Sequence, residues 1–352
     1  SSAASDVYKR QIEYMLQLDY IIDSFSKTKV RKMKPFIRNL LRMSVYQIKY
    51  MDAVPDSAVC NEAVKLAKRH KFAQLSGFVN GVLRNIARNI DSVQFDTLSI
   101  RYSMPQWIVD RFVAAYGEKK AEEIFKAFHN KSTISIRTNL TRCTPDELRA
   151  TLEAEGVTVT AIDELNYAFV ISGFDYLNGL QSFRDGLFYV QDISSMLVAQ
   201  TAAPKKGDYV IDVCAAPGGK STHIAELLQG SGHVLARDLT DNKVDMIEEN
   251  IDRHGLNNMS AEVWDATVFD ADSAGKADIL ICDLPCSGLG VLGRKKDIRY
   301  KMTPESVDEL AALQRQILDT VHTYVKPNGV LVYSTCTVSY THLRAHETLR
   351  HL

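Results

Sequence analysis

The apolar residues between residue 12 and about residue 128 recur at the spacing of amphipathic helices. The clearest apolar stripe consists of Phe36, Ile37, Leu40, Leu41, Val45 and Ile48. Pro55 ends this run, and Ser57 is expected to cap the helix that follows. Two more helical stretches are expected after Pro105. The pattern therefore predicts an all-α bundle with connecting helices over residues 12–128.

Short strand and helix patterns alternate between residues 129 and 200. Residues 133–140 read as one strand and residues 157–171 as two short strands. Thr144, with Glu147 three residues later, is a helix start signal. Residues 186–197 read as a strand that runs into a helix. These signals predict a small α+β region.

Strands and longer helices alternate from residue 201 to residue 338. The first unit, Tyr209–Leu228, reads as a buried strand, a break at Pro217-Gly218-Gly219 and a helix from Ser221. Later strands are expected at 232–239, 261–264, 277–283 and 330–334, and helices at 242–254 and 306–325, with a turn over 326–329. This alternation predicts a Rossmann-like α/β fold with a parallel sheet. The glycine turn matches neither the P-loop nor the dinucleotide pattern, so an ordinary βα turn and a ligand-binding turn both stay open.

The two ends of the chain, residues 1–11 and 339–352, resemble translated adapter sequence, and the fold prediction leaves them out. His342 and His346 have the i, i+4 spacing of a metal-binding pair, but no third ligand accompanies them. No metal site is expected.

The composition favours an ordinary soluble protein. The 352 residues are 45% apolar and 24% charged, and they include six cysteines. No apolar run approaches the roughly 18 residues of a membrane-spanning helix, and no secretory signal precedes the helical region. Six cysteines are too sparse for a disulfide framework and suit a reducing compartment. We therefore expect a cytoplasmic protein that does not contact a membrane.

The net charge of −1 conceals an asymmetry along the chain. Residues 27–90 contain 14 lysines and arginines against three acidic residues, a net charge of +11, and the remainder carries −12. A basic segment within an otherwise acidic chain favours a polyanion such as RNA as the binding partner of the basic segment. A merely solvated basic face is the alternative.

Candidate chemistry gathers where the predicted strands end. Asp238, Asp265, Asp283, Cys286 and Cys336 each lie at or just past the carboxyl end of a predicted strand. In an open α/β sheet this edge is where ligands bind. Asp212, just before the glycine turn, is also expected to meet a cationic or hydroxyl-bearing ligand. Asp238 follows it by 26 residues, near the spacing at which an acidic residue contacts a ribose.

Two cysteines at this edge, Cys286 and Cys336, come from unrelated segments. A thiolate is the reactive form, and Lys220 at the glycine turn is a candidate source of the positive charge that favours it. The alternative for either cysteine is a small buried apolar residue. Cys214 and Cys282 are interpreted as core residues, and Cys282 with Cys286 has no partner pair at zinc spacing.

Three sequence segments together form a family-specific signal. DVCAAPGGKSTHIAELL, DLPCSGLGVLGRKKDIRY and LVYSTCT resemble, in order and spacing, the RNA 5-methylcytosine methyltransferases. RNLLRMSVYQIKYMDAVPDSAVCNEAVKLAKRH and GFVNGVLRNIAR are similar to the NusB-like RNA-binding domain. This combination resembles the bacterial 16S rRNA cytosine-C5 methyltransferases of the RsmB/Sun type, over roughly residues 12–338.

The resemblance implies a class I methyltransferase domain over 201–338 that uses S-adenosylmethionine, behind a NusB-like domain and the α+β region at 129–200. It assigns the cofactor to Cys214, Ala215, Ala216, Pro217, Gly218, Gly219, Lys220, Asp238, Asp265 and Asp283. Asp238 would hold the ribose and Asp265 would lie beside the adenine. Asp283 would also form a hydrogen bond at nitrogen 3 of the cytosine. Cys336 matches the nucleophile that adds to carbon 6, and Cys286 matches the cysteine that assists product release.

The resemblance also implies a partner and alternatives. The expected substrate is 16S rRNA, naked or at an early stage of assembly, bound by a monomer. A tRNA cytosine methyltransferase and a non-catalytic RNA-binding factor are the other readings. In the family the chain continues past Val338 with a helix and two strands, and a further helix precedes residue 12. We therefore expect this chain to be less stable than a full-length relative, because its last strand is an open edge.

Overall fold

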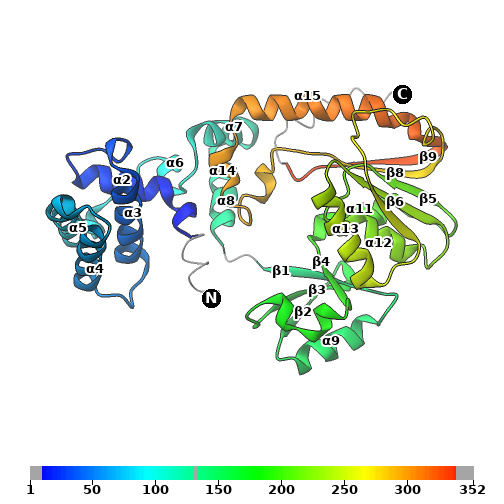
Figure 1. The fold of residues 1–352 in the computed structure, drawn as a ribbon, viewed down its shortest axis with the longest axis horizontal. Helices are drawn as coiled ribbons and strands as arrows, with labels where there is room; N and C mark the ends of the chain where they lie inside the picture. Colours follow the sequence, from blue (N-terminus) through cyan, green and yellow to red (C-terminus); the bar gives the residue numbers. More distant parts are fainter. Residues whose placement is uncertain (1–9, 131–132, 338–352) are drawn as a thin grey trace. The chain divides into compact units, whose positions relative to one another are not determined.

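The computed structural model describes residues 10–130 and 133–337 (Figure 1). The described residues divide into two compact units. One contains the chain up to Asn130 together with Leu289–Thr303, and the other contains Lys131–Gly288 and the chain from Pro304 onward. Among the described helices none is long and apolar enough to cross a membrane.

The first unit is built from helices, as the spacing predicts. They are α2 (Met15–Phe25), α3 (Pro35–Tyr50), α4 (Asp56–Arg69), α5 (Ser76–Asn89), α6 (Leu98–Arg101), α7 (Gln106–Tyr116) and α8 (Glu118–His129). The apolar stripe of α3 is buried in a core shared with α2, α4 and α5. The predicted cap at Ser57 is wrong, because α4 already begins at Asp56, and Pro55 precedes it without a side-chain cap.

The segment Leu289–Thr303 belongs to the helical unit although it follows the sheet strands in sequence. It contains the short helix α14 (Ile298–Lys301). The buried guanidinium of Arg299 donates to the Ser103 carbonyl oxygen at 3.3 Å, and Lys296 forms an ion pair with Glu13. The pattern of apolar residues gave no sign of this association, because the segment has no regular period.

The second unit contains the predicted small α+β region. Its strands are β1 (Ile134–Thr138), β2 (Thr158–Ile162), β3 (Leu165–Ser172) and β4 (Phe188–Val190), and its helices are α9 (Pro145–Ala154) and α10 (Gln181–Arg184). The strands form an antiparallel sheet in the order β2-β3-β1-β4. Thr144 and Glu147 form the predicted capping box at the start of α9.

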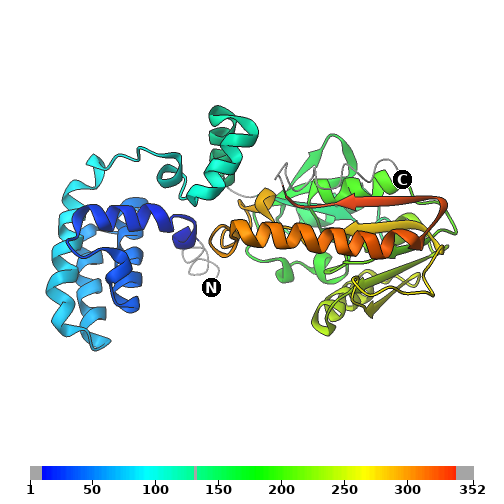
Figure 2. The ribbon, with the colours of Figure 1, turned by 90° about the horizontal axis from the view of Figure 1, so that it is seen from above.

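The second unit also contains the predicted parallel sheet. Its strands are β5 (Tyr209–Asp212), β6 (His233–Asp238), β7 (Met259–Val263), β8 (Ala277–Asp283) and β9 (Val325–Ser334), in the order β7-β6-β5-β8-β9. Its helices are α11 (Ile193–Ala202), α12 (Gly219–Leu227), α13 (Asp241–His254) and α15 (Pro304–Val321). Alternate side chains of the strands pack on opposite faces. One face is covered by α11, α12 and α13 and the other by α15, which runs alongside the sheet in Figure 2. The α/β fold prediction is confirmed.

The last strand differs from its prediction. Residues 326–329 were expected to form a turn before the strand, but β9 already begins at Val325. Its register against β8 shifts across these residues, so they form an irregularity within the strand pairing. A turn signal such as Pro327-Asn328-Gly329 does not distinguish a loop from such a bulge.

Candidate active site

The order of the strands reverses at the central strand of the parallel sheet. From the central strand β5 the chain proceeds outward to β6 and β7, then returns to the other side of β5 for β8 and β9. Ligands of open α/β sheets bind at such a reversal. The turn after β5 therefore lies between the acidic residue that ends β6 and the acidic residue that ends β8.

The glycine turn joins β5 to α12. Gly218 has φ of +99°, a conformation that residues with side chains rarely adopt. Asp212 ends β5 but is only 1% exposed, and it accepts hydrogen bonds from Ser221 Oγ at 2.5 Å and from the Cys214 backbone N–H at 3.4 Å. Burial raises the pKa of Asp212 to about 7, which the hydrogen bond from Ser221 opposes. The expectation that Asp212 meets a ligand is therefore wrong, since both its oxygens hold the turn.

Asp238 faces the turn from β6. Its Oδ2 accepts the backbone N–H of Ala216 at 2.9 Å, and its Oδ1 accepts Nζ of Lys243 at 2.8 Å. Asp265 lies two residues past β7 and is exposed. Hydrogen bonds from the hydroxyl and the backbone N–H of Thr267 lower the pKa of the Asp265 carboxyl. A carboxylate oxygen accepts more than one hydrogen bond, so the exposed Asp265 keeps capacity for hydroxyl or amine donors of a ligand. Asp238 is 4% exposed, and its Oδ1 also accepts the backbone N–H of Leu239 at 2.8 Å.

Asp283 ends β8 on the other side of the turn. Nζ of Lys220 donates to Oδ2 of Asp283 at 2.5 Å, and Oγ of Ser334 donates to Oδ1 at 2.9 Å. This ion pair corrects the expected role of Lys220, whose charge is paired with Asp283 rather than with a cysteine. The sequence did not single out Ser334, which fixes the second oxygen of the carboxylate.

The two cysteines expected at this edge lie in contact. Sγ of Cys286 and Sγ of Cys336 are 3.0 Å apart, although 50 residues separate them in the chain. The hydrogen bond from Cys336 lowers the pKa of the Cys286 thiol to about 6, against the opposing effect of burial. Backbone N–H groups of Gly288 and Cys336 contribute in the same direction. Cys336 is exposed and Cys286 is half-buried.

Two buried contacts tie the cysteine segments together, and sequence reasoning missed both. The hydroxyls of Ser287 and Thr337 lie 2.8 Å apart. Nε2 of Gln314 on α15 donates to the Pro285 carbonyl oxygen at 2.6 Å, and Oε1 of Gln314 accepts the Tyr333 hydroxyl at 2.9 Å. A signal for Gln314 was present, because it is a polar residue at a buried position of the apolar stripe of α15.

The remaining cysteines at the sheet have the environment of core residues. Cys282 is fully buried, and burial raises the pKa of its thiol well above the usual value. Burial also raises the pKa of Cys214, to about 12. Over residues 10–130 and 133–337, no group of three or more His, Cys, Asp or Glu side chains is arranged to hold a metal ion. His342 and His346 lie outside the described residues.

A surface cavity of about 410 Å³ lies elsewhere, lined among others by Thr141, Gln229 and Gly255. None of the predicted site residues lines it.

Comparison with known protein families matches three segments of the chain. The NusB family matches residues 1–88, the ferredoxin-like domain of RsmF/B-like methyltransferases matches residues 104–174, and the 16S rRNA methyltransferase RsmB/F matches residues 199–346. These ranges include most of the two ends that resemble adapter sequence, so their exclusion remains a prediction.

A curated relative from Bacillus subtilis (strain 168), named "Probable ribosomal RNA small subunit methyltransferase B", is 38% identical over 338 residues, which are 94% of this chain and 75% of the relative. The chain belongs to the RsmB/F family of 16S rRNA methyltransferases. A ribosomal RNA small subunit methyltransferase B from Proteus mirabilis (strain HI4320) is 31% identical, over 92% of this chain and 76% of the length of that relative. The crystal structure of NSun6 from Pyrococcus horikoshii with SFG, an S-adenosylmethionine analogue, has a TM-score of 0.63 at 25% identity, and covers 70% of this chain and 87% of that chain.

Family membership confirms the resemblance seen in the sequence, including the NusB-like helical unit and the Rossmann-like methyltransferase fold. The RsmB/F family consists of S-adenosylmethionine-dependent methyltransferases, which confirms the predicted cofactor. The assignment of individual side chains to the cofactor or to the reaction stays a prediction.

Proposed function

We propose that this RsmB/F family member methylates carbon 5 of a cytosine in 16S rRNA through a covalent bond between Cys336 and carbon 6 of the base. The observation that carries the proposal is the contact of the Cys286 and Cys336 sulfurs, 3.0 Å apart, at the carboxyl edge of the sheet. Asp283 lies at the same edge, held by Lys220 and Ser334. Neither a nucleotide-binding fold nor a structural role requires two exposed or half-buried thiols there.

The turn and the acids around it fit S-adenosylmethionine. At Gly219 an added side-chain carbon would lie 3.1 Å from the Tyr189 ring, so the turn needs glycine to pack there. Backbone N–H groups at the start of a helix suit the anionic carboxylate of the donor. We assign the turn from Cys214 to Lys220 to the methionine part, Asp238 to the ribose and Asp265 to the adenine side. The cofactor supplies an electrophilic methyl group for carbon 5.

Carbon 5 of cytosine is a weak nucleophile, which is why a thiol is needed. Cys336 loses its proton to solvent, and its sulfur forms a bond with carbon 6. The electron pair of the carbon 5–carbon 6 double bond then makes carbon 5 nucleophilic. Negative charge develops at nitrogen 3, and Asp283 is assigned to pass it a proton from the Lys220 ammonium with which it is paired. The proton returns by the same route when the product is released. The base has to leave its stack to reach this edge.

Product release restores the starting state of the two thiols. After methylation the Cys286 thiolate removes the proton from carbon 5. The electrons of that bond re-form the double bond, and the sulfur of Cys336 leaves carbon 6 with its bonding pair. The pair of sulfurs again holds one proton, as it did before the reaction. The backbone N–H groups of Gly288 and Cys336 support this role, because they lower the pKa of Cys286 and do not depend on the Cys336 thiol, which is bonded to the base at this step.

The helical unit is assigned to RNA binding. Residues 27–90 carry a net charge of +11, and Lys68, Arg69 and Lys71 at the end of α4 are exposed. Such charge supplies affinity for phosphates but does not read bases. The curated relatives are named for small-subunit ribosomal RNA, which favours 16S rRNA over tRNA as the substrate. That this RNA is naked or at an early stage of assembly stays our expectation. A monomeric, cytoplasmic enzyme remains our expectation.

The test is transfer of labelled methyl from S-adenosylmethionine to unmodified 16S rRNA by the wild type and two variants. We expect the wild type to label 16S rRNA, Cys336→Ala to be inactive, and Cys286→Ala to accumulate a protein–RNA adduct on a denaturing gel. An active Cys336→Ala variant would overturn the nucleophile assignment. Labelling of tRNA but not 16S rRNA would favour the tRNA enzyme, and RNA binding without labelling would favour a non-catalytic factor.

A further inference from the structure

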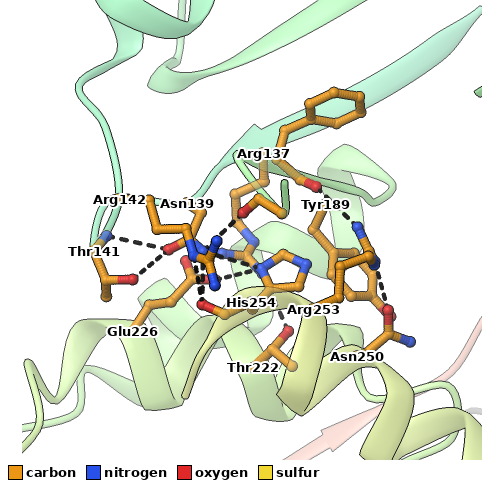
Figure 3. A network of polar contacts seen from close by, with 12 residues as sticks. Arg137, Asn139, Thr141, Arg142, Tyr189, Thr222, Glu226, Asn250, Arg253 and His254 are labelled. Atoms are coloured by element: carbon orange, nitrogen blue, oxygen red, sulfur yellow. Dashed lines mark hydrogen bonds and ion pairs between the residues drawn. The ribbon is translucent and has the colours of Figure 1, made fainter. Parts of the chain in front are cut away.

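A buried polar cluster joins the small α+β region to the parallel-sheet domain, and the proposed reaction does not use it. At its centre the guanidinium of Arg137 on β1 forms an ion pair with Glu226 on α12 (Figure 3). Nη2 of Arg137 also donates to Oγ1 of Thr222 at 3.2 Å. Arg137 is 0% and Glu226 4% exposed. Since a buried charge is costly unless it is paired, this cluster holds β1 in one position against α12.

Two side chains at β4 connect the cluster to the glycine turn. Gln191 accepts Nε of Arg137 at 2.8 Å, and its Nε2 donates to the Gly219 carbonyl oxygen at 3.1 Å. The Tyr189 hydroxyl donates to the Pro217 carbonyl oxygen at 3.1 Å. These two hydrogen bonds fix the orientation of the Gln191 amide, because only its oxygen can accept from Arg137 and only its nitrogen can donate to Gly219.

The ring of Tyr189 is itself fixed and forms a wall behind the turn. The guanidinium carbons of Arg137 and Arg253 lie 5.7 and 5.6 Å from its centre, and the His254 ring lies at 5.1 Å. Tyr189 is 6% exposed. Because a side-chain carbon at Gly219 would meet this ring at 3.1 Å, the turn lies against β4 with no space between them.

Holding the carbonyl oxygens also sets the direction of the N–H groups. In a trans peptide the C=O and the following N–H point in opposite directions. With the Gly219 oxygen held against Gln191, the N–H of Lys220 points away from β4. This N–H belongs to the first turn of α12, whose donors have no partner within the helix. The contacts with β4 therefore fix the orientation of groups that are available to a ligand.

We propose that Tyr189 and Gln191 are positioning residues of the S-adenosylmethionine site, so that the small α+β region forms part of that site. They donate to the carbonyl oxygens of Pro217 and Gly219 and preorganise the turn before the cofactor arrives. Asn250 also donates to the Pro217 oxygen, at 2.9 Å, and Thr222 to the Gly219 oxygen, at 3.3 Å. Arg137 acts through Gln191. This inference rests on the cofactor site proposed above.

The test is the dissociation constant of S-adenosylmethionine, measured by calorimetry on the full chain without RNA. Tyr189→Phe removes one hydroxyl and keeps the ring, and one lost hydrogen bond to the turn is expected to weaken binding about three- to tenfold. Gln191→Glu keeps the acceptor for Arg137 but sets a carboxylate oxygen against the Gly219 carbonyl, so we expect a loss of at least about tenfold. In methyl transfer, the KM for the cofactor should rise while kcat at saturation changes little.

Ile136→Val is the matched control, since Ile136 packs in the core of the same small sheet, in a cluster that contains no residue of the turn. It removes one buried methylene and should lower the melting temperature of the cofactor-free chain without changing the dissociation constant. Wild-type affinity in both Tyr189→Phe and Gln191→Glu would overturn the inference. So would equal losses in all three variants, which would indicate a general effect of stability. A wild-type chain that does not bind S-adenosylmethionine would instead overturn the proposed cofactor site itself.

Discussion

Replacing Arg137 by methionine tests the energetics of the cluster between the α+β region and the parallel sheet. Methionine is an apolar side chain of similar length, but it cannot pair with Glu226. Glu226 is 4% exposed, so its charge would be left buried without its partner. The remaining contact of Glu226 is with Nδ1 of His254 at 3.5 Å. Burial holds the pKa of His254 below its usual value, and Arg253, which stays in the variant, acts in the same direction. Glu226 opposes both, so the imidazole compensates poorly. We expect a loss of about 3–5 kcal/mol in the free energy of unfolding, as for other buried pairs that lose one partner.

The fluorescence of Trp264 in a Trp107→Phe background reports on the second unit alone, because the chain has two tryptophans and Trp107 lies in the first unit. For a unit of about 200 residues the predicted loss corresponds to a fall of roughly 6–20 °C in the midpoint of thermal unfolding. The Lys326–Asp278 pair, which is much more exposed than the Arg137–Glu226 pair, provides the control, and Lys326→Met should cost at most about 1 kcal/mol.

The double variant Arg137→Met, Glu226→Leu distinguishes a lost attraction from an uncompensated buried charge. Replacing both members of a buried ion pair by apolar residues is often neutral or stabilising. We therefore expect the double variant to regain most of the stability that Arg137→Met loses. The reasoning is refuted if Arg137→Met costs less than about 1 kcal/mol, or if the double variant is less stable than both single variants.

Three further outcomes are expected. Alkylation of Cys286 by iodoacetamide, followed by mass spectrometry of its peptide, should be half-maximal near pH 6, because the thiolate reacts and is present above its pKa of about 6. In Cys336→Ala the half-point should move upward toward the ordinary thiol value; an unchanged half-point would contradict the hydrogen-bond explanation. Gly186→Ala should destabilise the chain by at least about 2 kcal/mol more than Gly207→Ala in urea unfolding, because both have positive φ but only the carbon added at Gly186 would lie 1.9 Å from a backbone oxygen. Lys68→Glu should weaken rRNA binding and reduce its salt dependence in filter-binding assays; an unchanged salt slope would remove this part of α4 from the RNA-binding face.

The fold could be predicted wherever the sequence has a clear period. The stripe of α3 and the alternation in β1 specify a helix and a strand because one face of each is apolar. The association of Leu289–Thr303 with the helical unit could not be predicted, since that segment has no period and its contacts are distant in sequence. The bulge in β9 was missed because its turn residues suit a loop equally well.

The cysteines of the site could be predicted from sequence motifs, but the residues that support the site could not. Cys286 and Cys336 stand out because two thiols follow separate strands, and the structure places their sulfurs 3.0 Å apart. Arg137 occupies one of the polar positions of β1, in which polar and apolar residues alternate, and such a position would ordinarily face solvent. It is buried because α12 covers that side of β1. Contacts of this kind depend on how one domain lies on another, which local sequence does not encode.

The central claim is that Cys336 bonds to carbon 6 of a cytosine and Cys286 releases it. The most direct measurement is mass spectrometry of the adduct formed by Cys286→Ala with unmodified 16S rRNA and S-adenosylmethionine, after digestion with protease and nuclease. The account predicts one cross-linked peptide, with Cys336 joined to a cytidine that carries an added methyl group. An adduct on another cysteine, or none while the wild type still methylates 16S rRNA, would contradict it.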